Sequence, residues 1–381
     1  MTNIYEQKRS TLLIIIMYIV NALILYDARI SKRFANYFVY ICMIALLLGI
    51  LFIKRFTMER YLFFSMITVL LFAGISTYIN HENYTEWLTL VWFFGIYYCM
   101  RQMKMHKRYI ILFLIVNLTV FIYLIIYSYI NHAALESYII GYQKDTTVVN
   151  PNTVAIGIVE SYWLIVYVGK RTFLKKWLSI VLCIAAVSGI LRCGTRSALL
   201  FFGATLLVYL LLGERIKKNE RLAIALVIII IIVAYVMPFV FVSLWKTYGG
   251  GLKIMGKYVF NGRERIWNAY INYLNENPRA IIFGTGRKEV LLWHGSFNLH
   301  NSYLALHAEY GIVATVVYLA FIINSIRASY NTNRCISNEQ LIMYLMIIMV
   351  MMIGIVETTL TYILSCIYLA FPLGLMRIMR N

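Results

Sequence analysis

The feature that most constrains the fold is a series of long apolar segments along almost the whole chain. A helix that crosses a bilayer needs roughly 17–25 mostly apolar residues, because the hydrocarbon core is about 30 Å thick. The segments lack the alternation of barrel strands, so we expect an all-α, polytopic integral membrane protein with about 12 transmembrane helices. The predicted spans are 11–26, 34–53, 61–79, 86–100, 109–130, 152–169, 177–193, 197–213, 222–244, 301–326, 340–356 and 358–376.

The composition agrees with a bilayer environment. Of the 381 residues, 62% are hydrophobic and only 13% are charged, which leaves too little polar surface for a water-soluble globule. We find no internal repeat and no low-complexity linker, so a single transmembrane domain over residues 1–381 is expected. The apolar run after Arg9 has no small-x-small cleavage site, so we interpret it as an uncleaved first span.

The distribution of lysine and arginine predicts the orientation. With a cytoplasmic N-terminus, 21 of the 35 basic residues fall in inner loops; of the other 14, eight lie in the long loop 245–298 and six in short outer loops. Lysine and arginine collect in cytoplasmic loops, but this tendency has little force in long loops. Without the long loop, 21 basic residues are inside and six are outside, so both termini are expected in the cytoplasm. The formal net charge of +19 is explained by this topology and by anionic lipid, so no nucleic-acid partner is expected.

Two residue types exclude common kinds of metal site. The six cysteines show no CxxC spacing, so neither a disulfide framework nor a zinc site is expected. The chain has only two aspartates, Asp27 and Asp145, and no acidic pair to hold a divalent ion on a nucleotide sugar. We therefore expect neither a metal ion nor a cofactor.

The long loop 245–298 contains one amphipathic stretch. It begins near Gly249–Gly251, and residues 262–277 place Ile266, Trp267 and Tyr270 on one helical face, with Pro278 as a stop. We expect an extracytoplasmic loop with a helix that lies on the outer membrane surface.

Polar side chains gather at the outer ends of the later spans. For each arginine the alternative role is contact with lipid headgroups, and for the histidine it is a helix cap or a hydrogen bond between helices. Glu160, His307 and Glu309 lie further inside predicted spans, and their roles stay open. The outer candidates are Arg192, Arg196, Arg263, Arg265, Arg287, His300 and Asn301.

Four short motifs follow one another over roughly residues 150–326. They are NPN at 150–152, CGTRSALL at 193–200, GRERIW with NP and GTG within 262–286, and HNSYLALHAEYGIVA at 300–314. In this combination the chain resembles the bacterial O-antigen polymerase and O-antigen ligase superfamily. It departs from the family pattern at Thr195, where serine is usual, and at Ser197, where glycine is usual, but both residues remain small. The first five predicted spans match the family only in hydrophobicity and spacing.

The resemblance implies a fold similar to the metal-independent membrane glycosyltransferases of GT-C-like architecture. The donor would be an oligosaccharide on undecaprenyl diphosphate, at the outer face of the bacterial cytoplasmic membrane. A polymerase of O-antigen, capsule or exopolysaccharide attaches the growing glycan to a hydroxyl of the next lipid-linked repeat unit, whereas a ligase transfers it to the lipid A core. A partner protein that regulates chain length is implied by the resemblance alone.

The candidate residues supply a chemical hypothesis for that reaction. Arg196 and Arg263 would bind the diphosphate, because guanidinium groups stay protonated and bind phosphate oxygens in pairs. His300 would act as the general base for the acceptor hydroxyl, since imidazole exchanges protons near neutral pH. Weaker candidates for substrate contact are Arg192, Arg265, Arg287 and Asn301.

A flippase or transporter of lipid-linked oligosaccharide is the alternative from another class. Such proteins are often built from two related halves with charges near mid-bilayer. Here the halves show no similarity and the charges lie at the outer rim, which favours an enzyme. Between the two enzymes we favour the polymerase, because that role serves more pathways.

Overall fold

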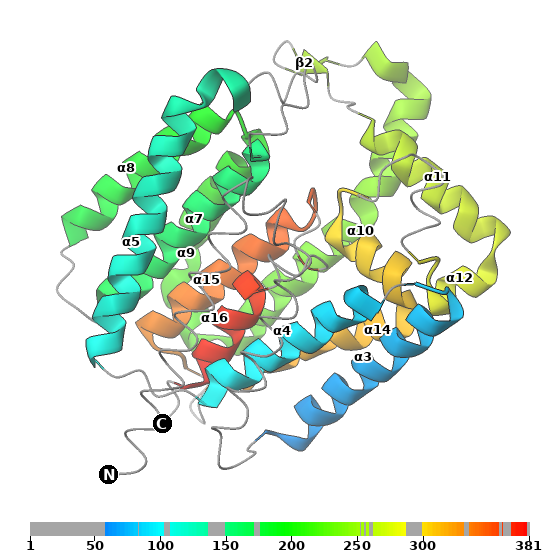
Figure 1. Cartoon of the computed structure of the whole chain (residues 1–381), viewed down its shortest axis with the longest axis horizontal. Helices are drawn as coiled ribbons and strands as arrows, with labels where there is room; N and C mark the ends of the chain where they lie inside the picture. Colours follow the sequence, from blue (N-terminus) through cyan, green and yellow to red (C-terminus); the bar gives the residue numbers. More distant parts are fainter. Residues whose placement is uncertain are drawn as a thin grey trace.

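The computed structural model describes residues 58–82, 84–102, 107–135, 149–170, 176–251, 253–254, 257–258, 262–286, 299–330, 335–357, 360 and 367–378. Within these ranges the regular secondary structure is helical, apart from one small antiparallel hairpin of β1 (Lys253–Ile254) and β2 (Lys257–Tyr258) (Figure 1). The predicted spans at 11–26 and 34–53 lie outside the described residues.

Each predicted span from 61–79 to 340–356 coincides with a described helix, and the last one overlaps α16. Of the described helices, 6 are long and apolar enough to cross a membrane, namely α3, α5, α7, α9, α10 and α14, which identifies a membrane protein. The expected total of about 12 spans stays a prediction. The long helices are α3 (Arg60–Ile79), α4 (Tyr84–Gln102), α5 (Lys107–Ile130), α7 (Pro151–Lys170), α8 (Lys176–Cys193), α9 (Arg196–Lys218), α10 (Glu220–Tyr248), α14 (Ser302–Arg327), α15 (Asn338–Ile353) and α16 (Ile367–Ile378).

The centre of the bundle is formed by α15 and α7. Every residue of α15 from Gln340 to Met351 is buried, and the helix contacts α7, α9, α10 and α16. In α7, 78% of the apolar window is buried inside the protein. A helix that is apolar on all sides and covered on all sides belongs in a bundle interior, so these two helices support the others.

The outer helices expose apolar side chains instead. In α10 only 22% of the apolar window is buried, and Ile229, Ile232, Val236 and Phe239 are each about half exposed. These residues recur at three- and four-residue steps, so they form one stripe along the helix. Such a stripe would be costly in water and is the surface expected toward lipid.

Helix α14 is interrupted near its middle, and a short helix packs into the interruption. Gly311 has φ 75° and ψ 174°, which are not helical values. The break leaves carbonyls of the preceding turn without partners in their own helix. Thr285, which follows α12 (Pro278–Phe283), donates its N–H to the Ala308 carbonyl at 2.7 Å, and the Ser76 hydroxyl of α3 donates to the Glu309 carbonyl at 2.8 Å. The segment 278–286 is thereby fixed between α3 and α14.

Helix α11 (Arg263–Glu276) lies within the loop 245–298 and packs against protein with part of its apolar face. Trp267 and Tyr270 are fully buried beside Val242 of α10 and Leu304 of α14. These two rings therefore contact the protein and not lipid, and they hold α11 against the start of α14.

Gly311 gives a test of the break in α14. A side chain there would place Cβ 1.9 Å from the Ile282 carbonyl oxygen, in a backbone conformation that disfavours every L residue. We expect Gly311→Ala to lower the stability by about 2 kcal/mol or more. The matched control is Gly203→Ala in α9, where nothing lies within 4 Å of the new methyl group. The thermal unfolding midpoints of the detergent-solubilised variants provide the measurement, and equal midpoints would contradict the role given to Gly311.

Candidate functional site

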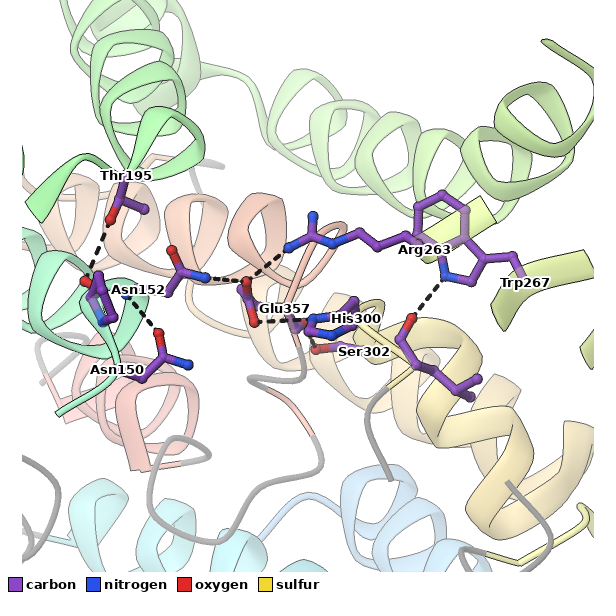
Figure 2. A network of polar contacts seen from close by, with 10 residues as sticks. Asn150, Asn152, Thr195, Arg263, Trp267, His300, Ser302 and Glu357 are labelled. Atoms are coloured by element: carbon purple, nitrogen blue, oxygen red, sulfur yellow. Dashed lines mark hydrogen bonds and ion pairs between the residues drawn. The ribbon is translucent and has the colours of Figure 1, made fainter. Parts of the chain in front are cut away.

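Four helix ends bring a cluster of polar side chains together (Figure 2). Asn152 lies in the first turn of α7, Arg263 begins α11, His300 precedes α14, and Glu357 follows α15. The Glu357 carboxylate lies at the centre of the cluster. The chain thus places side chains that are more than 200 residues apart in sequence around one acidic group.

The Glu357 carboxylate is held by two donors and lies close to a third group. Nη2 of Arg263 donates to Oε1 of Glu357 at 3.1 Å, and Nδ2 of Asn152 donates to the same oxygen at 2.7 Å. Nδ1 of His300 lies 3.8 Å from Oε2, which is too long for a hydrogen bond but close for an electrostatic contact. The side chains of Glu357, Arg263 and His300 are 12%, 20% and 31% exposed, so a molecule from outside can reach the histidine most easily.

The turn that carries Glu357 is tied to the start of α14. The Ser302 N–H donates to the Gly354 carbonyl at 2.7 Å, and the Ser302 hydroxyl donates to the Glu357 carbonyl at 2.6 Å. The same hydroxyl oxygen accepts a hydrogen bond from the Leu360 N–H at 3.1 Å. Because Ser302 lies two residues after His300, the backbones of the acid and the imidazole are held in a fixed relation.

His300 has a backbone conformation that is unusual for its residue type. Its φ is 49°, a left-handed value that costs an L residue about 1–2 kcal/mol. On either side the chain is anchored, since the Leu299 carbonyl accepts from Nε1 of Trp267 at 2.7 Å and Asn301 caps α14. A strained residue with fixed neighbours is typical of functional sites, where the surrounding structure determines the direction of the side chain.

Asn301 is occupied by contacts within the protein. It is fully buried; its Oδ1 accepts from the N–H groups of Tyr303 and Leu304, and its Nδ2 donates to the Ala234 carbonyl at 2.8 Å. That carbonyl has no partner in its own helix, because residue 238, four positions later, is proline. These contacts connect the start of α14 to α10 and do not support the predicted contact of Asn301 with substrate.

The junction of α8 and α9 lies beside the start of α7. The Thr195 hydroxyl donates to the Pro151 carbonyl at 3.4 Å, next to Asn152 (Figure 2). Arg196 follows Thr195 as the first residue of α9 and is exposed. It is therefore adjacent in the chain to a residue that contacts the rim of the cluster, and its guanidinium can reach solvent.

The other predicted arginines have different surroundings. Arg192 ends α8, and its guanidinium lies 5.0 Å from the centre of the Tyr129 ring. Arg265 is exposed on α11, two residues after Arg263 and on another face of the helix. Arg287 lies outside the described residues. The structure thus brings Arg263 and His300 together at Glu357 and shows no such contact for Arg192 or Arg265.

The glycines before Arg287 serve packing. Gly284 donates its N–H to the Ala280 carbonyl, and Gly286 donates its N–H to the Ala308 carbonyl. A Cβ at Gly284 would lie 2.5 Å from the Ala308 oxygen. The Gly284 amide therefore completes the last turn of α12, and the Gly286 amide holds the segment against α14.

His307 links α14 to α11 and α12. Its Nε2 donates to the Ile281 carbonyl of α12 at 3.0 Å, and its Nδ1 lies 3.0 Å from the Tyr270 hydroxyl of α11. Since burial raises the pKa of Tyr270, that hydroxyl stays protonated and donates to Nδ1. His307 therefore has a structural role in this arrangement.

Sequence reasoning missed Glu357 and gave Asn152 no role of its own. Asn152 lies in the NPN motif, while Glu357 stands at the boundary of the last two predicted spans. A carboxylate at the end of such an apolar stretch is costly in lipid, and this cost was the available signal. Its partners, however, come from distant parts of the chain.

The cluster is chemically suited to bind an anionic group and to accept a proton from a hydroxyl. Arg263 offers guanidinium N–H groups that match phosphate oxygens, and Arg196 follows Thr195, which contacts the residue before Asn152. The imidazole of His300 can accept a proton from a hydroxyl. The carboxylate beside it can stabilise the imidazolium that forms.

Comparison with known families agrees with these residues. Residues 181–319 match a family model described as O-Antigen ligase, which confirms the resemblance to the O-antigen polymerase and ligase superfamily over that stretch. The matched stretch runs from α8 into α14 and contains Arg196, Arg263 and His300, but neither Asn152 nor Glu357. No curated protein sequence matches the chain.

The contact between Asn301 and the carbonyl left free by Pro238 can be tested by a double-mutant cycle. Asn301→Ser keeps a good helix cap but removes the donor to Ala234, so it should cost about 1–3 kcal/mol. In a Pro238→Ala background the new N–H bonds to Ala234 within α10, and the same substitution should then cost clearly less. Thermal unfolding of the four proteins measures the coupling, and an equal cost in both backgrounds would rule it out.

Proposed function

We propose that this chain is a membrane glycosyltransferase that polymerises surface polysaccharide. It transfers a growing glycan from undecaprenyl diphosphate to a hydroxyl of the next lipid-linked repeat unit. The observation that carries the proposal is the cluster of Arg263, His300, Asn152 and Glu357 at four helix ends of a membrane protein. The family match over residues 181–319 supports the same class of reaction.

The cluster would face outward from the bacterial cytoplasmic membrane. If the basic loops are cytoplasmic, as the sequence predicts, the ends of α7 and α14 that carry Asn152 and His300 lie on the outer side. The glycan-bearing diphosphate of the donor would approach the cluster from this side, while its lipid tail stays in the bilayer. The exposed apolar stripes of the outer helices provide surface for that tail and for membrane lipid.

The reaction separates the sugar from a diphosphate. The bond between sugar C1 and the diphosphate oxygen breaks with its electron pair on the diphosphate, and Arg196 and Arg263 stabilise the added negative charge. The acceptor hydroxyl attacks C1 while His300 takes its proton. Energy for the transfer comes from the diphosphate bond, so the reaction needs no nucleotide, and the two arginines take the place of a metal ion at the leaving group.

The remaining candidates lie around this centre. Arg192 and Arg265 are exposed, and together with Arg287 they would attract the anionic donor at longer range. Asn301 would act through the backbone of His300, which it fixes as the cap of α14. A protein that limits chain length is the expected partner.

The second candidate is the ligase, which uses the same donor but transfers the glycan to the lipid A core. The description of the matching family, O-Antigen ligase, favours this alternative. Both enzymes need the same groups at the diphosphate and differ in the acceptor. The flippase alternative has no support in the fold or in the family match.

Substitutions in the source strain test the site and separate the two enzymes. Arg196→Ala should reduce transfer by about 10²–10³-fold, and His300→Asn by about 10²–10⁴-fold, because asparagine tolerates the left-handed backbone but cannot act as the base. The matched controls are Arg215→Ala at the inner end of α9 and His81→Asn, whose φ of 52° is also left-handed.

The readout is the surface polysaccharide on a gel, with the membrane level of each variant measured in parallel. Loss of long chains, while single repeat units still reach their final acceptor, supports the polymerase. Accumulation of lipid-linked polymer with no glycan attached supports the ligase. An unchanged ladder in both site variants would refute the assigned roles.

Chelation provides a second test with purified protein. We expect extension of lipid-linked oligosaccharide to proceed at the same rate after dialysis against EDTA, because arginines and not a metal ion neutralise the leaving diphosphate. A rate that falls with EDTA and returns with Mg²⁺ would contradict this mechanism.

A further inference from the structure

Glu357 occupies a position that the proposed transfer does not by itself explain. A carboxylate lies against Arg263, one of the two arginines assigned to an anionic diphosphate. Like charges repel strongly in a partly buried site. A carboxylate placed there should therefore weaken binding of the donor unless it does something else for the reaction.

We propose that Glu357 is a positioning residue that exchanges partners during the reaction. Before the donor binds, it holds the Arg263 guanidinium; once the diphosphate takes Arg263, its carboxylate serves His300 instead. This inference rests on the proposed function, since it names how the same site changes on binding its diphosphate. It concerns a residue outside the stretch matched by the family model.

The contacts of the carboxylate permit such an exchange. Its two present donors, Arg263 and Asn152, both bind Oε1, while Oε2 is directed toward His300 (Figure 2). A diphosphate carries more charge than one carboxylate and offers more oxygen atoms, so it competes well for the guanidinium. Asn152 is neutral and can keep its hydrogen bond while Arg263 changes partner.

The backbone of Glu357 is fixed, so only its side chain needs to move. The Glu357 carbonyl accepts from the Ser302 hydroxyl at 2.6 Å, and its N–H donates to the Ile353 carbonyl at 3.0 Å. The present gap of 3.8 Å between Oε2 and Nδ1 of His300 exceeds a hydrogen bond by about 1 Å. A rotation of the carboxyl group can close a gap of this size.

The exchange places negative charge where the reaction creates positive charge. His300 takes the proton from the acceptor hydroxyl as the new bond from that oxygen to sugar C1 forms. The electron pair of the broken bond leaves with the diphosphate, which Arg263 holds. The imidazolium then lies beside a carboxylate that fixes the ring and stabilises its charge, as the acid does in other histidine-centred sites.

The test is Glu357→Gln, which keeps the size and the hydrogen-bonding oxygen but removes the charge. We expect the variant to bind farnesyl diphosphate about 10-fold more tightly than the wild type, because a like charge has been removed. We expect its kcat for extension of lipid-linked oligosaccharide to fall by roughly 10²-fold or more, because the imidazole loses its anionic partner. A residue that only maintains the fold would weaken binding and turnover together.

Binding is measured by calorimetry on the full-length protein in detergent, and turnover on the same preparations. The matched control is Glu339→Gln, in the first turn of α15 at the far end of the helix that precedes Glu357. It should change neither quantity. Glu357→Asp keeps the charge, so it should bind farnesyl diphosphate as weakly as the wild type and retain part of the turnover. Thermal unfolding verifies that each variant is folded.

The outcomes separate this inference from the function on which it rests. If the wild type binds farnesyl diphosphate and extends glycan, but Glu357→Gln binds no more tightly or turns over normally, the exchange is refuted and the transferase stands. If the wild type neither binds farnesyl diphosphate nor extends lipid-linked glycan, the proposed function fails as well. Tighter binding with slower turnover in Glu357→Gln supports the exchange.

Discussion

The arrangement of this bundle depends on one constraint, that backbone polar groups inside a membrane protein must find partners within the protein. An unpaired peptide group in hydrocarbon costs several kcal/mol. Two long helices contain breaks that create such groups, at Pro238 in α10 and at Gly311 in α14. Asn301 pairs the carbonyl left by the first break, and Ser76 pairs a carbonyl beside the second. The helices that carry these side chains are thereby fixed relative to one another.

Hydrogen bonds of the same kind also position the candidate site. Because Asn301 connects α14 to α10, and Trp267 of α11 holds the carbonyl of Leu299, the residue between them has little freedom. That residue is His300, in its left-handed conformation. Ser302 then connects the start of α14 to the turn after α15, which brings Glu357 within reach. The hydrogen bonds that pair backbone carbonyl groups therefore also determine where Glu357, His300 and Arg263 meet.

The charge balance of the cluster relates the structure to the proposed chemistry. In the described state the Arg263 guanidinium is paired with Glu357, so a partly buried cation is not left without a counterion. In the proposed mechanism, binding of an anionic donor changes that balance, since a diphosphate is the stronger partner for arginine. The Glu357 carboxylate would then be a substitute for the substrate charge in the empty site, and it would weaken donor binding. His300 would gain from the exchange the neighbour that a protonated imidazole needs.

Much of the fold followed from the sequence, because the apolar period and the length of each run are local properties. The predicted spans from 61–79 to 340–356 match described helices closely, and Arg263 and His300 were chosen from residue type, position and the family resemblance. The sequence could not show that the amides of the glycines before Arg287 donate hydrogen bonds within the protein. It also could not show that the Asn301 amide group donates to a carbonyl of α10. Glu357 was also missed, because the role of a single acid between two apolar segments depends on the side chains that contact it in the fold. Those neighbours come from three other helix ends, and their meeting depends on how the helices pack.

The sequence by itself determined that this chain is a helical membrane protein with cations and a histidine near its later helix ends, since hydrophobicity and charge are read residue by residue. Only the tertiary structure decided which of these groups share one site, because distances between helices are set by packing and by the pairing of polar groups far apart in the chain.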